Sequence, residues 1–269
     1  EHPAVSAGGD TALIYDVGGE DLLLYRDREE LFSLTQGEGQ SILSAGLNEN
    51  GWLAVVHQES GYKGAVTIYD NSYETPLIQL SLSSRFVMDA AVSPDNRSVA
   101  VLTVGLADGS FDSRVDIYRL DRTEADTEPD HTCSVGGDAV LALRWSGSGI
   151  WVLGETSLSV VSPGGELAGT YDYGGRYLKA FSLDGDGTAA LLLGKYRAGS
   201  TAELVAVEPD GEARAALDVA EQVLSLSAAG RYVGVLTADR LDVYSQSLEP
   251  YSSLEGTQGA QTVLLRADG

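Results

Sequence analysis

The chain has 269 residues, of which 43% are hydrophobic, so it is long enough to bury a core of domain size. Its formal net charge is −23, with 17 Lys and Arg against 40 Asp and Glu. An acidic chain of this kind repels a phosphate backbone, which argues against nucleic-acid binding. It also has no run of about 18 apolar residues that would predict a transmembrane helix.

Short turns rich in Gly, Asn, Asp and Ser recur along the chain about every 40 residues, and a period of that size with short strands is typical of propeller blades. The turns are AGGD (7–10), NENG (48–51), SPDN (93–96), SGSG (146–149), DGDG (184–187), SAAG (227–230) and RADG (266–269). We interpret each turn as the link between the first two strands of one blade.

Each period predicts four strands. An apolar strand comes before the turn and a second comes after it, as in VMDAAV and SVAVLT around SPDN. A third strand often ends in an aromatic residue, as in AVTIYD, and a more polar fourth closes the unit, as in PLIQLSL. We expect the first two strands to be covered on both faces and the outermost fourth to be exposed. The prediction is an all-β fold, a single β-propeller domain over residues 1–269.

The chain contains six complete repeats and then QTVLLRADG (261–269), which predicts one extra inner strand. That strand either joins the N-terminal region to close a six-bladed ring or begins a seventh, incomplete blade. The third repeat carries two longer segments, TVGLADGSFDSR (103–114) and DRTEADTEPDHT (121–132). We expect both to be extended loops, and the second, which is acidic and poor in apolar residues, to be mobile.

The SPDNRSVAVL stretch resembles the Ser-Pro-Asp-Gly hairpin of WD40-like and YVTN-type bacterial propellers, with Asn96 in the place of glycine. Asn tolerates the same left-handed backbone. The Gly-His and Trp-Asp marks of true WD40 repeats are missing. The stretches 12–25 and 171–187 look like an uncharacterised, membrane-anchored bacterial family of unknown function. That resemblance implies a seven-bladed propeller at the cell surface, on an anchor absent from this chain, and it supplies no catalytic residues.

The residues suggest no cofactor, no metal site and no catalytic set. The three histidines, His2, His57 and His131, share no metal-ligand spacing or repeat position, and we expect His57 to be an ordinary strand-edge residue. Cys133 has no partner for a disulfide and is predicted to be a buried, inert thiol. The DGDG turn imitates the start of a calcium loop but lacks the later acidic ligand, so we interpret it as a hairpin turn.

One set of polar residues comes from aligning the repeats two positions before each inner strand: Gln40, Arg85, Asp138, Arg176, Glu221 and Gln261. The next position adds Phe86 and Tyr177. In a propeller these positions surround the mouth of the central channel. Either Arg–acid pairs tie adjacent blades together there, or the arginines hold an anionic ligand while the two aromatic rings stack on it.

The sequence therefore favours a non-catalytic, extracytoplasmic, monomeric module that binds a protein or cell-wall partner. One alternative is the binding of a small ligand or carbohydrate at the channel mouth. The other is a hydrolase or lyase that uses Asp138 and Glu221 as acid and base. An interaction module predicts paired arginines and an exposed apolar patch, a ligand site predicts free arginines, and an enzyme predicts two carboxylates without arginine partners.

Overall fold

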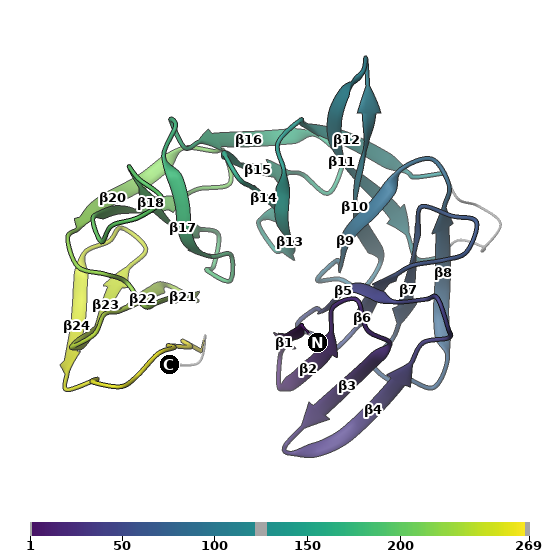
Figure 1. Cartoon of the computed structure of the whole chain (residues 1–269), viewed down its shortest axis with the longest axis horizontal. Coiled ribbons are helices and arrows are strands. Elements are labelled where there is room, and N and C mark those ends of the chain that lie inside the picture. Colours follow the sequence, from purple (N-terminus) through teal and green to yellow (C-terminus); the bar gives the residue numbers. More distant parts are fainter. Residues whose placement is uncertain (1, 122–127, 267–269) are drawn as a thin grey trace. The chain divides into compact units, whose positions relative to one another are not determined.

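A computed structural model describes residues 2–121 and 128–266. All regular structure in these residues is β: 24 strands form six four-stranded antiparallel sheets (Figure 1). The all-β fold class is confirmed, and six such sheets are consistent with a six-bladed β-propeller. The described residues contain no helix that could cross a membrane. Residues 267–269 of the RADG turn and 122–127 of the predicted acidic loop lie outside the described residues, and the last two residues of that predicted loop, His131 and Thr132, begin β12.

The strands fall into two compact units, Glu1–Asp138 with Pro163–Glu166, and Ala139–Ser162 with Leu167–Gly269. The first unit contains three sheets, β1 (Pro3–Gly8), β2 (Thr11–Asp16), β3 (Asp21–Arg26) and β4 (Glu29–Thr35); β5 (Ile42–Leu47), β6 (Leu53–His57), β7 (Gly64–Tyr69) and β8 (Pro76–Leu82); and β9 (Phe86–Val92), β10 (Ser98–Ala107), β11 (Ser110–Arg119) and β12 (His131–Gly136).

The second unit also contains three sheets, β13 (Val140–Ser146), β14 (Gly149–Gly154), β15 (Ser157–Val161) and β16 (Leu167–Asp172); β17 (Tyr177–Ser182), β18 (Ala189–Gly194), β19 (Ala202–Val207) and β20 (Ala213–Val219); and β21 (Ser225–Ala229), β22 (Tyr232–Leu236), β23 (Arg240–Ser245) and β24 (Pro250–Glu255). Each sheet is one predicted repeat with its strands in chain order, so the repeat boundaries read from the turns are correct.

The second and third strands of the sheets form most of the core. Every residue of β6, β7 and β14 is buried, because side chains on both faces pack against other elements. The first strands were expected to be equally covered, and this was wrong: β9 alternates buried and more exposed residues, since only one of its faces packs well. Most fourth strands are exposed as predicted, and all of β24 is exposed, but β8 buries Ile78, Leu80 and Leu82 in the core.

The SPDN turn has the backbone that its sequence predicted. Asn96 lies at φ 60°, the left-handed region that Asn tolerates. The Ser93 hydroxyl donates to Asp95 Oδ1 at 2.6 Å and accepts the Ser98 N–H at 3.0 Å. The bond from the Ser93 hydroxyl, together with the Arg97 N–H, holds the pKa of the Asp95 carboxyl below its ordinary value. The turn is therefore closed by its own side chains.

Three segments differ from the sequence predictions. Residues 103–114 form no loop but the outer half of the β10–β11 hairpin, which turns at Asp108 and Gly109, both with positive φ. The first strand, β1, was not predicted. The described part of the expected last strand, residues 261–266, is not a strand: its Val263 and Leu265 N–H groups donate instead to the hydroxyls of Ser225 and Ser227 on β21.

Candidate functional site at the entries to the inner strands

Four of the predicted polar residues bond to a partner at the hairpin between the second and third strands of their own sheet. The Gln40 amide donates to Glu59 Oε2 at 3.1 Å, and Glu221 Oε1 lies 3.1 Å from Arg240 Nη2. Arg85 pairs with Asp112 and Arg176 with Glu203. The expectation that such pairs tie adjacent blades was wrong for these four. The antiparallel register places the entry to each first strand beside the hairpin of the same sheet.

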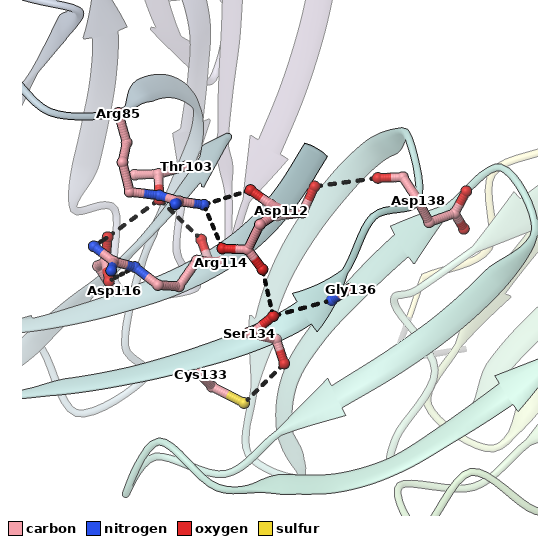
Figure 2. A network of polar contacts seen from close by, with 10 residues as sticks. Arg85, Thr103, Asp112, Arg114, Asp116, Cys133, Ser134, Gly136 and Asp138 are labelled. Atoms are coloured by element: carbon pink, nitrogen blue, oxygen red, sulfur yellow. Dashed lines mark hydrogen bonds and ion pairs between the residues drawn. The ribbon is translucent and has the colours of Figure 1, made fainter. Parts of the chain in front are cut away.

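Arg85 is enclosed by side chains of the β10–β11 hairpin, as Figure 2 shows. Its Nε donates to Thr103 Oγ1 at 2.9 Å, and its Nη2 lies 3.0 Å from Asp112 Oδ2 and also donates to the Asp112 carbonyl. Asp112 in turn accepts the Ser134 hydroxyl of β12 at 2.5 Å. The Arg85 side chain is only 11% exposed. It is therefore a brace between β9, the hairpin and β12, not a free anion clamp.

Arg176 is also engaged. Its Nε donates to the Tyr173 carbonyl at 2.6 Å, its Nη2 donates to the Tyr171 hydroxyl at 2.9 Å, and its Nη1 bonds to Glu203. Tyr173 is fully buried and donates its hydroxyl to the Gly154 carbonyl at 3.1 Å. Tyr171, Tyr173 and Arg176 therefore form a packed and hydrogen-bonded cluster within the second unit.

The two predicted aromatic residues are half-exposed and line separate cavities. Phe86 lies in a cavity of about 1070 Å³ together with Gln40, and Lys63 Nζ sits 4.4 Å from its ring centroid. Tyr177 lies in a cavity of about 580 Å³, where the guanidinium carbon of Arg197 is 5.4 Å from its ring centroid. Both rings already stack with a cation, so each lines a polar–aromatic pocket without its neighbouring entry arginine.

The remaining two predicted residues sit in different surroundings. Asp138 accepts the Ser113 hydroxyl on its backbone carbonyl at 3.1 Å. Gln261 is exposed and lies outside the strands. Farther along the first strands, the Ser44 hydroxyl of β5 donates to Asp89 Oδ1 of β9 at 2.7 Å.

Sequence reasoning missed the buried centre of the third sheet. Asp116 is fully buried and accepts hydrogen bonds from Thr103 at 3.2 Å and from Arg114 Nη2 at 2.9 Å. Arg114 Nε also lies 2.7 Å from Asp116 Oδ1, an ionic contact without hydrogen-bond geometry. The signal was an acid in the middle of the apolar stretch RVDIYRL, because a buried carboxylate requires a partner.

The structure also places His57 and Cys133, which the sequence singled out. His57 is buried rather than at an edge, with Nε2 2.9 Å from Thr67 Oγ1 and Nδ1 3.0 Å from the Gln58 carbonyl oxygen, so its ring is a satisfied core group. Cys133 is buried as predicted, and burial raises the pKa of its thiol. No group of three or more His, Cys, Asp or Glu that could hold a metal occurs in residues 2–121 or 128–266.

A family model described as a family of unknown function, DUF5711, matches residues 1–140. This match spans more than half of the chain. No curated protein matches the sequence.

Proposed function

The chain belongs to the DUF5711 family, and we propose that it is a non-catalytic propeller module that binds a protein partner on the outer side of a membrane. The location rests on the resemblance to membrane-anchored bacterial propellers, which implies an anchor beyond this chain. The observation that carries the binding role is an exposed apolar pair on the outer part of the β10–β11 hairpin.

The hairpin carries different chemistry on its two faces. Leu106 and Phe111 stand directly opposite each other and are 68% and 72% exposed. Directly opposed residues point to the same face of an antiparallel pair. The opposite face carries Thr103, Asp112 and Arg114 of the polar network (Figure 2). The outer hairpin projects from the sheet in Figure 1. It thus exposes an apolar surface on one face, while the polar network holds it from the other face.

The brace favours binding because it fixes the hairpin before a partner arrives. Arg85, Asp112 and Ser134 connect the hairpin to the strands on both sides of it. A preorganised surface loses less conformational entropy on association than a mobile loop does. The network therefore holds Leu106 and Phe111 in position for a partner, and this role requires no bound ligand.

The alternatives fit the geometry less well. A ligand site at the strand entries requires free arginines, but Arg85 and Arg176 each bond to a carboxylate and to one backbone carbonyl. An acid–base pair built on Glu221 requires a carboxylate without an arginine partner, and Glu221 lies 3.1 Å from Arg240. Arg85, Arg176 and Glu221 are therefore each already paired within their own sheet.

The surroundings of the apolar pair also indicate the partner. Asp108 is exposed at the turn between Leu106 and Phe111, and the whole chain is strongly acidic. Charge complementarity favours a protein that offers an apolar pocket bordered by Lys or Arg. Buried apolar anchors of this kind dominate the affinity of many interfaces.

The test is site-specific photo-crosslinking on the purified chain, with a photoreactive phenylalanine in place of Phe111, against an extract of the source cell envelope. We expect one protein adduct, and an at least tenfold lower recovery of that protein by Leu106→Ser/Phe111→Ser. The control is Tyr251→Ser/Leu254→Ser, which removes two other exposed apolar side chains. Equal recovery by both double variants would overturn the proposal.

A further inference from the structure

The smaller cavity, beside the start of β17, concentrates positive charge in this acidic chain. Four of the 17 Lys and Arg residues lie between positions 176 and 197. The charged residues that line the cavity are Lys179, Arg197 and Glu155, a local balance of +1 against −23 for the whole chain. A positive site in a negative field selects for anions that reach it through specific contacts. We propose that this cavity binds a small amphipathic carboxylate.

Lys179 is held in place by the backbone rather than by an acid. Its ammonium donates to the Gly199 carbonyl. Its aliphatic stem lies directly over Gly194 of β18, where an added Cβ would collide with Lys179 Cε. Within the described part of the chain no carboxylate pairs with Lys179. An ammonium has three donors, so the cation keeps hydrogen-bonding capacity for an anion.

Arg197 is the second cation, and its existing ion pair is weak. Its Nη2 lies 3.1 Å from Glu155 Oε1, but the two side chains are 76% and 54% exposed. Exposed pairs of this kind contribute little, so an incoming carboxylate can compete with Glu155 for the guanidinium. The Tyr177 ring below Arg197 orients the guanidinium without neutralising it.

The other residues that line the cavity indicate the chemistry of the part of the ligand attached to the carboxylate. Leu141, Leu178, Leu192 and Val223 supply apolar surface, and Ser200 and Gln222 supply the uncharged polar side chains. A volume of about 580 Å³ is within the range of small-molecule sites. The lining fits a carboxylate attached to an aliphatic or aromatic group, either a free organic acid or the C-terminus of a peptide that ends in an apolar residue.

The larger cavity in the first unit makes a useful contrast. Its charged lining residues are Glu38, Glu59 and Lys63, and the Lys63 ammonium lies over the Phe86 ring. Its local balance is −1, so the same argument gives no attraction for an anion there. The residues of the anion site all belong to the second unit and the β10–β11 hairpin belongs to the first, so the two proposals can fail independently of each other.

The experiment is isothermal titration calorimetry with octanoate, octanamide, and a Leu-terminated tripeptide with a free or an amidated C-terminus. We expect the carboxylates to bind and their amides to bind at least tenfold more weakly. Binding by octanoate identifies a free acid as sufficient, whereas binding by the free-acid peptide alone identifies a chain terminus. Equal binding by acids and amides, or by none of the four, would overturn the proposal.

Three variants locate the site. Lys179→Gln should weaken octanoate or peptide binding at least tenfold, and Gly194→Ala should do the same because the new Cβ displaces the Lys179 stem. Lys195→Gln is the matched control: it removes a nearby cation that lies 5.6 Å from the Tyr196 ring centroid and does not line the cavity. If all three variants weaken binding equally while keeping the wild-type melting temperature, attraction is nonspecific and the site is refuted.

Discussion

The third and the sixth sheets contain the same polar cluster in two different states. In each, a Thr donates its hydroxyl to the backbone carbonyl of an Arg on the third strand, at 3.3 and 3.2 Å; the pair lies in the middle of β10 and β11 in the third sheet and at the turn between β22 and β23 in the sixth. In each, that arginine's Nε contacts the Asp two residues later, at 2.7 and 2.8 Å. The clusters are Thr103, Arg114 and Asp116 in the third sheet and Thr237, Arg240 and Asp242 in the sixth.

The clusters differ in the residue that enters from the first strand. In the third sheet it is Arg85, which brings a second cation and pairs with Asp112. In the sixth it is Glu221, which brings a second acid to the one arginine. The first arrangement balances two cations with two acids, and its Asp116 side chain is 0% exposed. The second is unbalanced and more exposed, with Asp242 at 16% and Arg240 at 46%, against 0% for Asp116 and 31% for Arg114. A balanced set of charges can be buried, whereas an unbalanced set stays where water screens it.

The largest effect should come from removal of the buried acid. Asp116→Asn leaves Arg114 without its carboxylate at a partly enclosed site and weakens the bonds to Thr103, so we expect a loss of about 3 kcal/mol of unfolding free energy. The corresponding Asp242→Asn should cost about 1 kcal/mol or less. Urea unfolding with an unchanged slope measures both. Similar losses for the two variants would contradict the comparison.

Substitution of the entry residues should also destabilise the third sheet more than the sixth, with smaller losses of unfolding free energy. Arg85→Gln removes the ion pair to Asp112 and the bond to the Asp112 carbonyl, and we expect a loss of about 2 kcal/mol. Because these bonds brace the hairpin, amide hydrogen exchange in β10 and β11 should accelerate as well. Glu221→Gln, at an exposed pair, should change stability by less than about 1 kcal/mol. If exchange in β10 and β11 stays at the wild-type rate in Arg85→Gln, Arg85 is no brace.

The sequence predicted the repeat well and the pairing within it poorly. Turn residues such as those of SPDN determine backbone geometry locally, so the position of every first hairpin could be read from them. The partner of an entry residue depends on the hairpin between strands two and three, and its length varies. Thr237 and Arg240 face each other across two residues, whereas Thr103 and Arg114 face each other across ten.

The missed hairpin did leave a signal. Asp108-Gly109 is a dipeptide that favours tight hairpin turns, and both residues have the positive φ that such a turn requires. Leu106 and Phe111 on either side of it were part of two strands that continue beyond the usual blade length. The period of the other repeats made this extension look like an insertion. The cavities could not be predicted at all, because residues as distant as Leu141 and Val223 line the same one.

The smallest effect should come from the exposed, unbalanced cluster, and salt should reveal it. Arg240 bonds to Asp242 and lies close to Glu221, and these two acids raise the pKa of its guanidinium. Arg240→Gln leaves two carboxylates facing each other in a chain of net charge −23, so the variant should melt slightly below the wild type at low ionic strength. The difference should vanish near 1 M salt, where the screening length is about 3 Å. The Asp116→Asn deficit should persist at 1 M salt, because desolvated groups are screened far less. A thermal-melt series from 10 mM to 1 M NaCl on both variants separates the two cases, and parallel salt curves would mean that burial does not distinguish the clusters.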